Sequence, residues 1–335
     1  MSGSAIDELR LGLEQAMSRD QAGKVEGLQR LSAGASQEIW AFDFVPEKGE
    51  REPLILRRAP ENQTLGDFSI PMEIEAKTIE HVYRHGVAVP PVRYRLLHED
   101  GIGEGYIMER VPGETLPPRI MHKPEFAKAR NRFAEDAGRA LARLHAVPLE
   151  GLNLPEYSPA TFVAELNAIY TRNDIPNPVF AMSLKWLEDN LPDYSRRCLV
   201  HGDMRLGNVM LGEEGLRAIL DWELAHVGDP IEDLGWLTIN SWRFGNIDLE
   251  AGGLGTREAL IEAYEAESGA KVDLHAFRFW QVCGSLRWGI LCSTMVAKVA
   301  NGEDRTPERA VIARRASENE IDLLDLLLPL EGPHA

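Results

Sequence analysis

Apolar and polar side chains alternate along residues 24–58, which is the period-two pattern of β-strands. The alternation falls into three stretches, so three strands are expected there. A helical pattern of charged residues, Leu and Ala precedes them over about 4–18, and another helix, rich in Glu, Lys and Ala, is expected over about 71–84. Two further strands are expected near 92–98 and 105–111. The pattern therefore predicts an N-terminal helix followed by a unit of five strands and one helix.

Beyond residue 111 the pattern becomes mainly helical. Apolar residues recur with a period near 3.6 over Glu125–Val147, and a proline in its first turn marks the helix that begins at Ser158. Further helices are expected over 181–190, 232–241, 256–267, 273–300 and 307–328, and short strands around 198–200, 208–211 and 217–221. The sequence therefore predicts an α+β protein with an N-terminal helix (1–20), a small antiparallel-sheet lobe (21–111) and a larger, mainly helical lobe (112–335).

Composition narrows the class of protein. Hydrophobic residues make up 44% and charged residues 27% of the 335, as in globular proteins, and the formal net charge of −17 argues against nucleic acid as the main partner. The three cysteines form no C-x-x-C pair, which favours a reducing compartment. The N-terminal residues contain no uninterrupted apolar stretch, so no signal peptide is expected, and charges interrupt the apolar stretch 277–300. A cytoplasmic protein without a membrane span is expected.

Three oxygen-bearing side chains stand in one stretch of the helical half. Asp203 precedes Asn208 by five residues, and Asp221 follows Asn208 by thirteen. Between the last two lie an apolar strand, a turn with two glycines and a second apolar strand, so a hairpin is expected to bring them close together. Asp203 would remain on the loop before this hairpin.

This set suits phosphoryl transfer, in which positioning and charge neutralisation do most of the work. A carboxylate such as Asp203 can receive the proton of an acceptor hydroxyl. Mg²⁺ is usually held by one or two protein oxygens together with phosphates and water, and Asn208 and Asp221 can supply those oxygens. For each residue alone the turn interpretation is favoured, but the three together favour catalysis.

The run from His201 to Asn208 resembles the catalytic loop of the aminoglycoside phosphotransferase and choline kinase superfamily, whose members are distant relatives of protein kinases. The segments 220–223 and 228–236 resemble its metal-binding segment and the helix after it. The resemblance implies a protein-kinase-like fold, Asp203 as catalytic base, and Asn208 and Asp221 as Mg²⁺ ligands. It also implies ATP as the donor, with GTP left open, and a small molecule with a hydroxyl group as the acceptor.

By position in that family, residues 32–36 would cover the phosphates, with Gly34 and Ser36 as contacts to the nucleotide. The segment has a single glycine, so its place between two strands carries the assignment. A richer glycine cluster at 101–105 is not followed by a helix, and a hairpin turn is expected there instead.

Arg57 occupies the strand position where the family normally has a lysine for the α- and β-phosphates. Arginine keeps the positive charge, and Glu75 on the following helix is the expected ion-pair partner. Ile55 lies on the same strand face, under the adenine, whereas Arg58 lies on the opposite face and is expected to be solvated.

The resemblance places the adenine at the hinge that links the two lobes. Met108 would border the adenine, and its other interpretation is ordinary core packing. The backbone carbonyl of Glu109 and the backbone amide of Val111 would form hydrogen bonds with the base.

Four residues near the catalytic loop are expected to have secondary roles. Arg205 would either stabilise the transferring phosphoryl group or be a surface arginine of the loop. His201 is expected to orient the loop and not to act as the base. Asp229 and Asp233 stand at a helix start, where capping and support of the loop are expected.

Several alternatives remain open for the acceptor. The sequence is most similar to the branch of the superfamily that is fused to acyl-CoA dehydrogenases, which implies a hydroxyacyl-CoA. An aminoglycoside or amino-alcohol phosphotransferase, or a nucleotide-binding regulator without turnover, is the alternative. A protein kinase is disfavoured because no Asp-Phe-Gly or Ala-Pro-Glu segment frames an activation loop after the catalytic loop. Either a monomer or a homodimer is compatible with the sequence.

Overall fold

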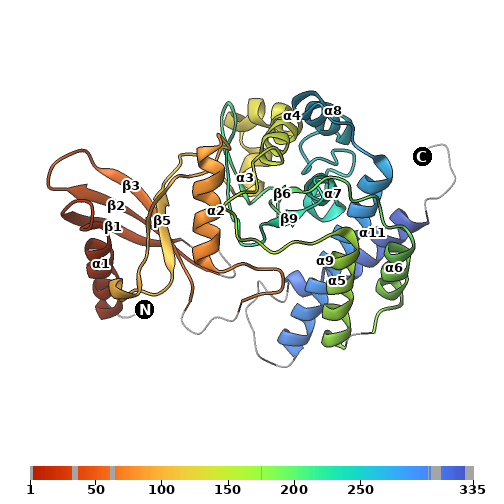
Figure 1. Cartoon of the computed structure of the whole chain (residues 1–335), viewed down its shortest axis with the longest axis horizontal. Coiled ribbons are helices and arrows are strands. Elements are labelled where there is room, and N and C mark those ends of the chain that lie inside the picture. The colour runs from red at the N-terminus through yellow and green to blue at the C-terminus, as the bar shows by residue number, and fades with distance from the viewer. Residues whose placement is uncertain are drawn as a thin grey trace. The chain divides into compact units, whose positions relative to one another are not determined.

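The computed structural model describes residues 3–31, 37–60, 65–174, 176–300, 302 and 311–328. The chain forms two compact units (Figure 1). The first comprises Met1–Gly113, Glu150–Leu154 and Arg217–Ala225, and the second comprises Glu114–Leu149, Pro155–Leu216 and His226–Ala335. The first unit therefore contains two short segments that lie far along the sequence from its main part.

The first unit is built on a five-stranded antiparallel sheet with the order β1-β2-β3-β5-β4. Its strands are β1 (Gly23–Leu31), β2 (Glu38–Pro46), β3 (Glu52–Arg58), β4 (Val92–Arg95) and β5 (Gly105–Glu109), and its helices are α1 (Gly3–Met17) and α2 (Met72–Arg84). The predicted five-stranded unit is confirmed. The glycine cluster at 101–105 leads from β4 into β5, which pair as antiparallel strands, so the hairpin expected there is confirmed as well.

The two faces of this sheet differ because successive residues of a strand point to opposite sides. Leu54 and Leu56 of β3 are fully buried in an apolar cluster with α1. That cluster also contains Leu9, Leu13, Met17, Trp40, Phe42 and Phe44. Ile55 and Arg57 lie on the other face, where Arg57 meets α2. One face of β3 is therefore core, and the other carries charge.

The second unit is mainly helical. Its helices are α3 (Pro117–His122), α4 (Ala127–Leu144), α5 (Pro159–Asn173), α6 (Pro178–Asp189), α7 (Ile231–Thr238), α8 (Arg257–Ser268), α9 (Leu274–Ala300) and α11 (Ala316–Leu327). The long helix α9 packs against α5, α6, α7 and α11. Gly235 lets α7 approach α9 closely, since a Cβ atom there would lie 2.7 Å from the Cβ atom of Trp280. The predicted two-part, kinase-like α+β architecture is confirmed.

Short strands carry the loops that matter for chemistry. β6 (Cys198–Val200) pairs with β9 (His226–Gly228), and β7 (Val209–Gly212) pairs with β8 (Gly215–Ile219). The hairpin expected after Asn208 is thus confirmed, whereas β9 was not expected. The helix predicted over 232–241 ends earlier, at Thr238, because Ile239 is extended. The predicted start of the last helix, near 307, lies outside the described residues. Within the described part of the chain, no helix is long and apolar enough to cross a membrane.

Candidate active site

The carboxylate of Asp203 is held by three donors, all from the second unit. Its Oδ1 atom accepts hydrogen bonds from Arg205 Nε at 3.1 Å and from the indole Nε1 of Trp236 at 3.0 Å. Its Oδ2 atom accepts one from Asn208 Nδ2 at 2.6 Å. The side chain is 15% exposed, so solvent can still reach it. The carboxylate is fixed in place and remains accessible, as a group that receives a proton should be.

Asn208 is oriented by its amide nitrogen. Nδ2 donates both to the backbone carbonyl of Asp203 at 3.0 Å and to its carboxylate. These two bonds use both amide protons, and Oδ1 of Asn208 accepts no hydrogen bond from the residues that the structure describes. An amide oxygen turned away from its only side-chain partner is a suitable ligand for Mg²⁺, so this residue fits the metal that the family implies.

Arg205 is bound within its own loop. Besides the ion pair with Asp203, its Nη1 donates to the backbone carbonyl of Leu206 at 3.3 Å, and its guanidinium lies 4.9 Å from the ring centre of Trp242. The side chain is 28% exposed. Arg205 is therefore more than a surface arginine, and its contact with a γ-phosphate stays a prediction.

A buried carboxylate supports the loop from below. Asp233, in the first turn of α7, accepts the backbone N–H groups of His201 at 2.8 Å and Gly202 at 2.9 Å, and the ring of His145 donates to it at 3.2 Å. His201 in turn accepts the backbone N–H of Asp203 through Nδ1 at 3.1 Å. The expected supporting roles of His201 and Asp233 are confirmed.

We expect Asp233→Asn to destabilise the fold by about 2–3 kcal/mol, because an amide cannot accept all three hydrogen bonds and leaves a buried N–H unpaired. Burial raises the pKa of Asp233, but the bonds from His145 and the His201 backbone outweigh it and hold the pKa below the usual 3.8. The stabilisation by the carboxylate is therefore complete above pH 3.8 and is lost as the pH falls further. Urea unfolding between pH 3 and pH 7 should show the difference between wild type and variant shrinking below pH 3.8. A difference that does not change with pH would contradict this.

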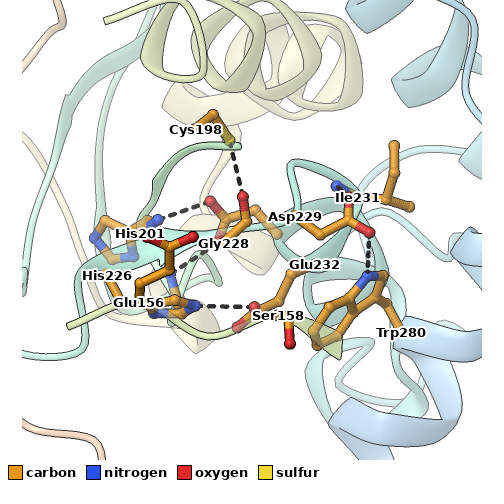
Figure 2. A network of polar contacts seen from close by, with 12 residues as sticks. Glu156, Ser158, Cys198, His201, His226, Gly228, Asp229, Ile231, Glu232 and Trp280 are labelled. Atoms are coloured by element: carbon orange, nitrogen blue, oxygen red, sulfur yellow. Dashed lines mark hydrogen bonds and ion pairs between the residues drawn. The ribbon is translucent and has the colours of Figure 1, made fainter. Parts of the chain in front are cut away.

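Other polar groups beneath the loop are paired in the same manner (Figure 2). Asp229 accepts the backbone N–H of Ile231 at 2.9 Å, which caps α7, and the indole N–H of Trp280 at 3.0 Å. The ring of His226 in β9 donates to Glu232 at 3.0 Å. The capping role expected for Asp229 is confirmed. Strand β9 and helix α7 thus support the catalytic loop through paired polar groups, and among these groups Oε1 of Glu232 has no hydrogen-bond partner in the described part of the chain.

A second charged cluster lies in the first unit, on the α2 face of the sheet. Nη2 of Arg57 is 3.3 Å from Glu75 and donates to Asp221 at 2.7 Å. The side chain of Glu75 is fully buried, that of Arg57 is 7% exposed and that of Asp221 is 29% exposed. The pairing of Arg57 with Glu75 is confirmed. Glu73, on the same helix, instead pairs with Lys77 at the surface.

Burial would lower the pKa of Arg57, but the charges of Glu75 and Asp221 outweigh it, and the pKa lies well above its ordinary value. Burial also raises the pKa of Glu75, which Arg57 only partly offsets. Two further residues share the cluster. Gln37 accepts from Arg57 Nε at 2.8 Å and donates to Glu223 at 3.1 Å, and the hydroxyl of Tyr106 donates to Glu75 at 3.0 Å. The guanidinium of Arg57 is thus permanently charged, and it is held by Gln37, Glu75 and Asp221.

Asp221 reaches Arg57 because the backbone turns sharply after β8. Its φ angle of 66° lies in the left-handed region, which costs most residues energy but is tolerated by Asp. Backbone hydrogen bonds from Ile219 to Ala88 and from Ile70 to Glu223, both 2.8 Å, attach the segment on either side. A strained backbone conformation that the surrounding structure keeps in place is common at functional sites.

The remaining nucleotide residues are placed as follows. Ile55 and Met108 are 8% and 9% exposed, and they stand opposite each other in the pairing of β3 with β5. After Glu109, at the end of β5, the backbone N–H of Val111 has no hydrogen bond with any described residue and lies at a partly exposed position. A free donor next to a strand end is available to a ligand such as adenine. Gly34 and Ser36 lie outside the described residues.

One expectation was wrong. Arg58 is only 16% exposed, and it pairs with Glu38 of the neighbouring strand at 2.6 Å while donating to the carbonyl of Ile102 at 3.2 Å. Protein therefore covers the strand face opposite Arg57 at this end of β3. The guanidinium of Arg58 binds protein groups there in place of water.

Sequence reasoning missed several residues that contact the site. Trp236 is buried, and its indole N–H binds Asp203. Gln37 and Tyr106 were not singled out for polar roles, although both belong to the Arg57 cluster. Only the position of Gln37, directly after the segment 32–36 that is expected to cover the phosphates, could have suggested it.

Comparison with known proteins agrees with this arrangement. Acyl-CoA dehydrogenase family member 11 of Gallus gallus is 30% identical over 210 residues, which cover 58% of this chain and 26% of that protein. The protein of the same name from Pongo abelii is 26% identical over 310 residues, which cover 86% of this chain and 37% of that protein. The chain spans between 18% and 37% of the length of the curated relatives it matches. The expected similarity to the acyl-CoA-dehydrogenase-associated branch is confirmed.

Solved structures share the fold. A candidate aminoglycoside phosphotransferase from Ralstonia eutropha has a TM-score of 0.74 at 21% identity, covering 94% of this chain and 97% of that one. Aminoglycoside phosphotransferase APH(4)-Ia in a ternary complex with AMP-PNP and hygromycin B has a TM-score of 0.59 at 17% identity, covering 95% and 100%. The sequence model of the phosphotransferase enzyme family matches residues 27–280, which include both the Arg57 strand and the Asp203 loop. This chain therefore belongs to the phosphotransferase enzyme family, as its catalytic-loop sequence predicted.

Proposed function

We propose that this phosphotransferase is an ATP-dependent, Mg²⁺-requiring kinase that transfers the γ-phosphate to a hydroxyl group of a small molecule. The observation that carries the proposal is the fixed but accessible carboxylate of Asp203, together with Asn208, whose amide is oriented so that its oxygen is free. A regulator without turnover would have no need of a carboxylate held by three donors. The intact set argues for catalysis, as it did in the sequence.

In this proposal Asp203 receives the proton of the acceptor hydroxyl as its oxygen attacks the γ-phosphorus. Asn208 and Asp221 would hold Mg²⁺, which when bound supplies positive charge to the phosphate oxygens. Arg205 would add charge on the side of the transferring group. The protein contributes orientation: each of these side chains is anchored by hydrogen bonds to buried or backbone partners.

The nucleotide would contact the first unit. Arg57 would bind the α- and β-phosphates in place of a lysine, and Glu75 keeps its guanidinium in position. The carbonyl of Glu109 and the N–H of Val111 would bind the adenine, with Ile55 and Met108 beside it. Residues Gly34 and Ser36 would cover the phosphates. Support for ATP comes from the structural relative that was crystallised with AMP-PNP.

For the acceptor we favour a hydroxyacyl-CoA, because the curated relatives carry acyl-CoA dehydrogenase names. An aminoglycoside or an amino alcohol is the alternative, supported by the relative that binds hygromycin B. We also propose a cytoplasmic location. Cys198, Cys283 and Cys292 are all free thiols and buried, as expected in a reducing compartment.

Consumption of the γ-phosphate should be measured with Mg²⁺ and a panel of hydroxyacyl-CoAs, amino alcohols and aminoglycosides. We expect turnover with at least one hydroxyacyl-CoA, and no turnover after chelation of the metal. Asp203→Asn serves as the control for contaminating kinases. If the wild type binds ATP but consumes it with no member of the panel, the regulator without turnover becomes the better interpretation.

A further inference from the structure

The indole of Trp236 contacts the carboxylate of Asp203 from a helix that lies 33 residues further along the chain. Its Nε1–H donates to Oδ1 over 3.0 Å, while the ring is only 5% exposed. Packing at this position does not require the N–H, since a phenylalanine ring, which lacks it, would fill most of the same volume. A buried donor aimed at the reacting carboxylate is therefore a candidate for a functional contact.

The indole cannot move away easily. The ring of Trp242 lies 5.3 Å from it, the guanidinium of Arg287 lies 4.7 Å from its ring centre, and the position of a Cβ atom on Gly284 would lie 3.1 Å from its Cε3 atom. Arg287 is itself attached to the loop, because its Nη1 donates to the carbonyl of Gly202 at 2.9 Å. Contacts on several sides thus hold the indole in the orientation that serves Asp203.

The three donors leave the two carboxylate oxygens unequal. An ionised carboxylate offers about four lone-pair positions, two on each oxygen. Trp236 and Arg205 occupy both positions on Oδ1, and Asn208 occupies one on Oδ2. The remaining position on Oδ2 has no hydrogen-bond partner among the described residues.

We propose that Trp236 is a positioning residue, which together with Arg205 saturates Oδ1 of Asp203 and so directs the acceptor hydroxyl to Oδ2. This rests on the kinase function proposed above. As the acceptor oxygen bonds to the γ-phosphorus, its O–H bond breaks and the proton passes to Oδ2. The bond from the phosphorus to the ADP oxygen breaks, and the electron pair leaves with ADP. Arg205 keeps its Nε bond to Oδ1 while its partly exposed guanidinium adds positive charge beside the carboxylate, and Trp236 keeps the carboxylate plane fixed.

Trp236→Phe tests this, because it keeps an aromatic ring and removes the N–H. We expect kcat to fall roughly 10- to 100-fold, the value of a hydrogen bond to a charged group, with the KM values for ATP and acceptor changed less than twofold. The matched control is Trp280→Phe, which removes a buried indole N–H from Asp229 in the same unit. The control should lose stability and keep its kcat. Equal kcat values in Trp236→Phe and wild type would overturn the proposal.

A double-mutant cycle separates positioning from general damage. If Trp236 acts only through Asp203, adding Trp236→Phe to Asp203→Asn should not lower the residual single-turnover rate further. If Trp236→Phe lowers the rate of Asp203→Asn by as large a factor as it lowers that of the wild type, the tryptophan supports the fold or the substrate instead. That result would refute the assignment.

An NMR measurement needs no acceptor. The chain has seven tryptophans, so seven indole ¹⁵N–¹H signals are expected. Asp203→Asn should shift the Trp236 signal and leave that of Trp280 in place; the signals are assigned with the two phenylalanine variants, or through backbone connections if a variant does not fold. A Trp236 signal unmoved by Asp203→Asn would refute the contact. If the wild type transfers phosphate to no acceptor, but Asp203→Asn still shifts the Trp236 signal, the proposed function fails and the contact stands.

Discussion

Asp203→Ala is expected to lower kcat by about 10²–10⁴-fold, while nucleotide affinity stays close to that of the wild type. The carboxylate that would receive the acceptor proton is lost, but no residue of the Arg57 cluster is changed. Oδ2 of Asp203 is also the acceptor for Asn208, whose Nδ2 keeps a bond to the backbone carbonyl at 3.0 Å. The metal ligand should therefore remain oriented in the variant, which confines the effect to turnover.

The measurement pairs steady-state transfer with calorimetric titration of the Mg²⁺ complex of a non-hydrolysable ATP analogue. Asp203→Asn is the better-matched variant, because it preserves the volume and its amide oxygen can still accept the bonds from Trp236 and Arg205, although its amide nitrogen cannot accept the bond from Asn208. Both variants should bind the analogue normally. Loss of nucleotide affinity with unchanged turnover would show that Asp203 contributes to nucleotide binding and not to the proposed proton transfer.

Arg57→Met is expected to destabilise the fold by about 3–5 kcal/mol and to weaken ATP binding at the same time. The variant leaves the fully buried Glu75 without its cation, and removing one partner of a buried pair is costly. It also removes the charge proposed to bind the phosphates. Arg57→Lys should recover part of the stability and part of the ATP affinity. Lysine restores the charge but cannot bond to Gln37, Glu75 and Asp221 together.

Two controls identify the cause. Adding Glu75→Gln to Arg57→Met should restore part of the stability by removing the uncompensated charge, but should not restore ATP binding. Since burial raises the pKa of Glu75 above its usual 4.5, and Arg57 offsets this, the folded variant should hold a proton on Glu75 more tightly than the unfolded chain does. Its stability relative to wild type should therefore be greatest at low pH and decrease as the pH rises above 4.5. A destabilisation that does not change with pH would exclude Glu75 as its origin.

The sheet unit was predictable from the sequence because its central strands alternate between an apolar and a polar face. Leu54 and Leu56 alternate with Ile55 and Arg57, and this alternation is visible without coordinates. β9 was missed because it has three residues, too few to show a period, and its partner β6 precedes it by 28 positions. Helix α7 was found, but all eight of its residues are buried. A helix without a polar face gives no indication of which side chains point to the site, so the contact of Trp236 with Asp203 could not be foreseen.

The candidate site was predictable to the extent that local motifs define it. The loop from His201 to Asn208 carries its own hydrogen bonds, and the expected roles of His201 and Asp233 followed from their positions. The Arg57–Glu75 pair followed from strand register and helix position. By contrast, the protection of Arg58 by Glu38 depends on the register between β2 and β3, which no single-strand pattern reveals.

The segment Arg217–Ala225 belongs to the first unit although more than a hundred residues separate it from the sheet. It supplies Asp221 to Arg57 and attaches to the backbone at Ala88. During synthesis on the ribosome, the sheet can therefore assemble early, but its charged cluster stays incomplete until residue 225 has left the exit tunnel. A fragment that ends at Gly113 would keep the Arg57–Glu75 pair but lack Asp221, the second carboxylate on the guanidinium, so dissecting the protein at that point would not yield a self-sufficient nucleotide-binding module.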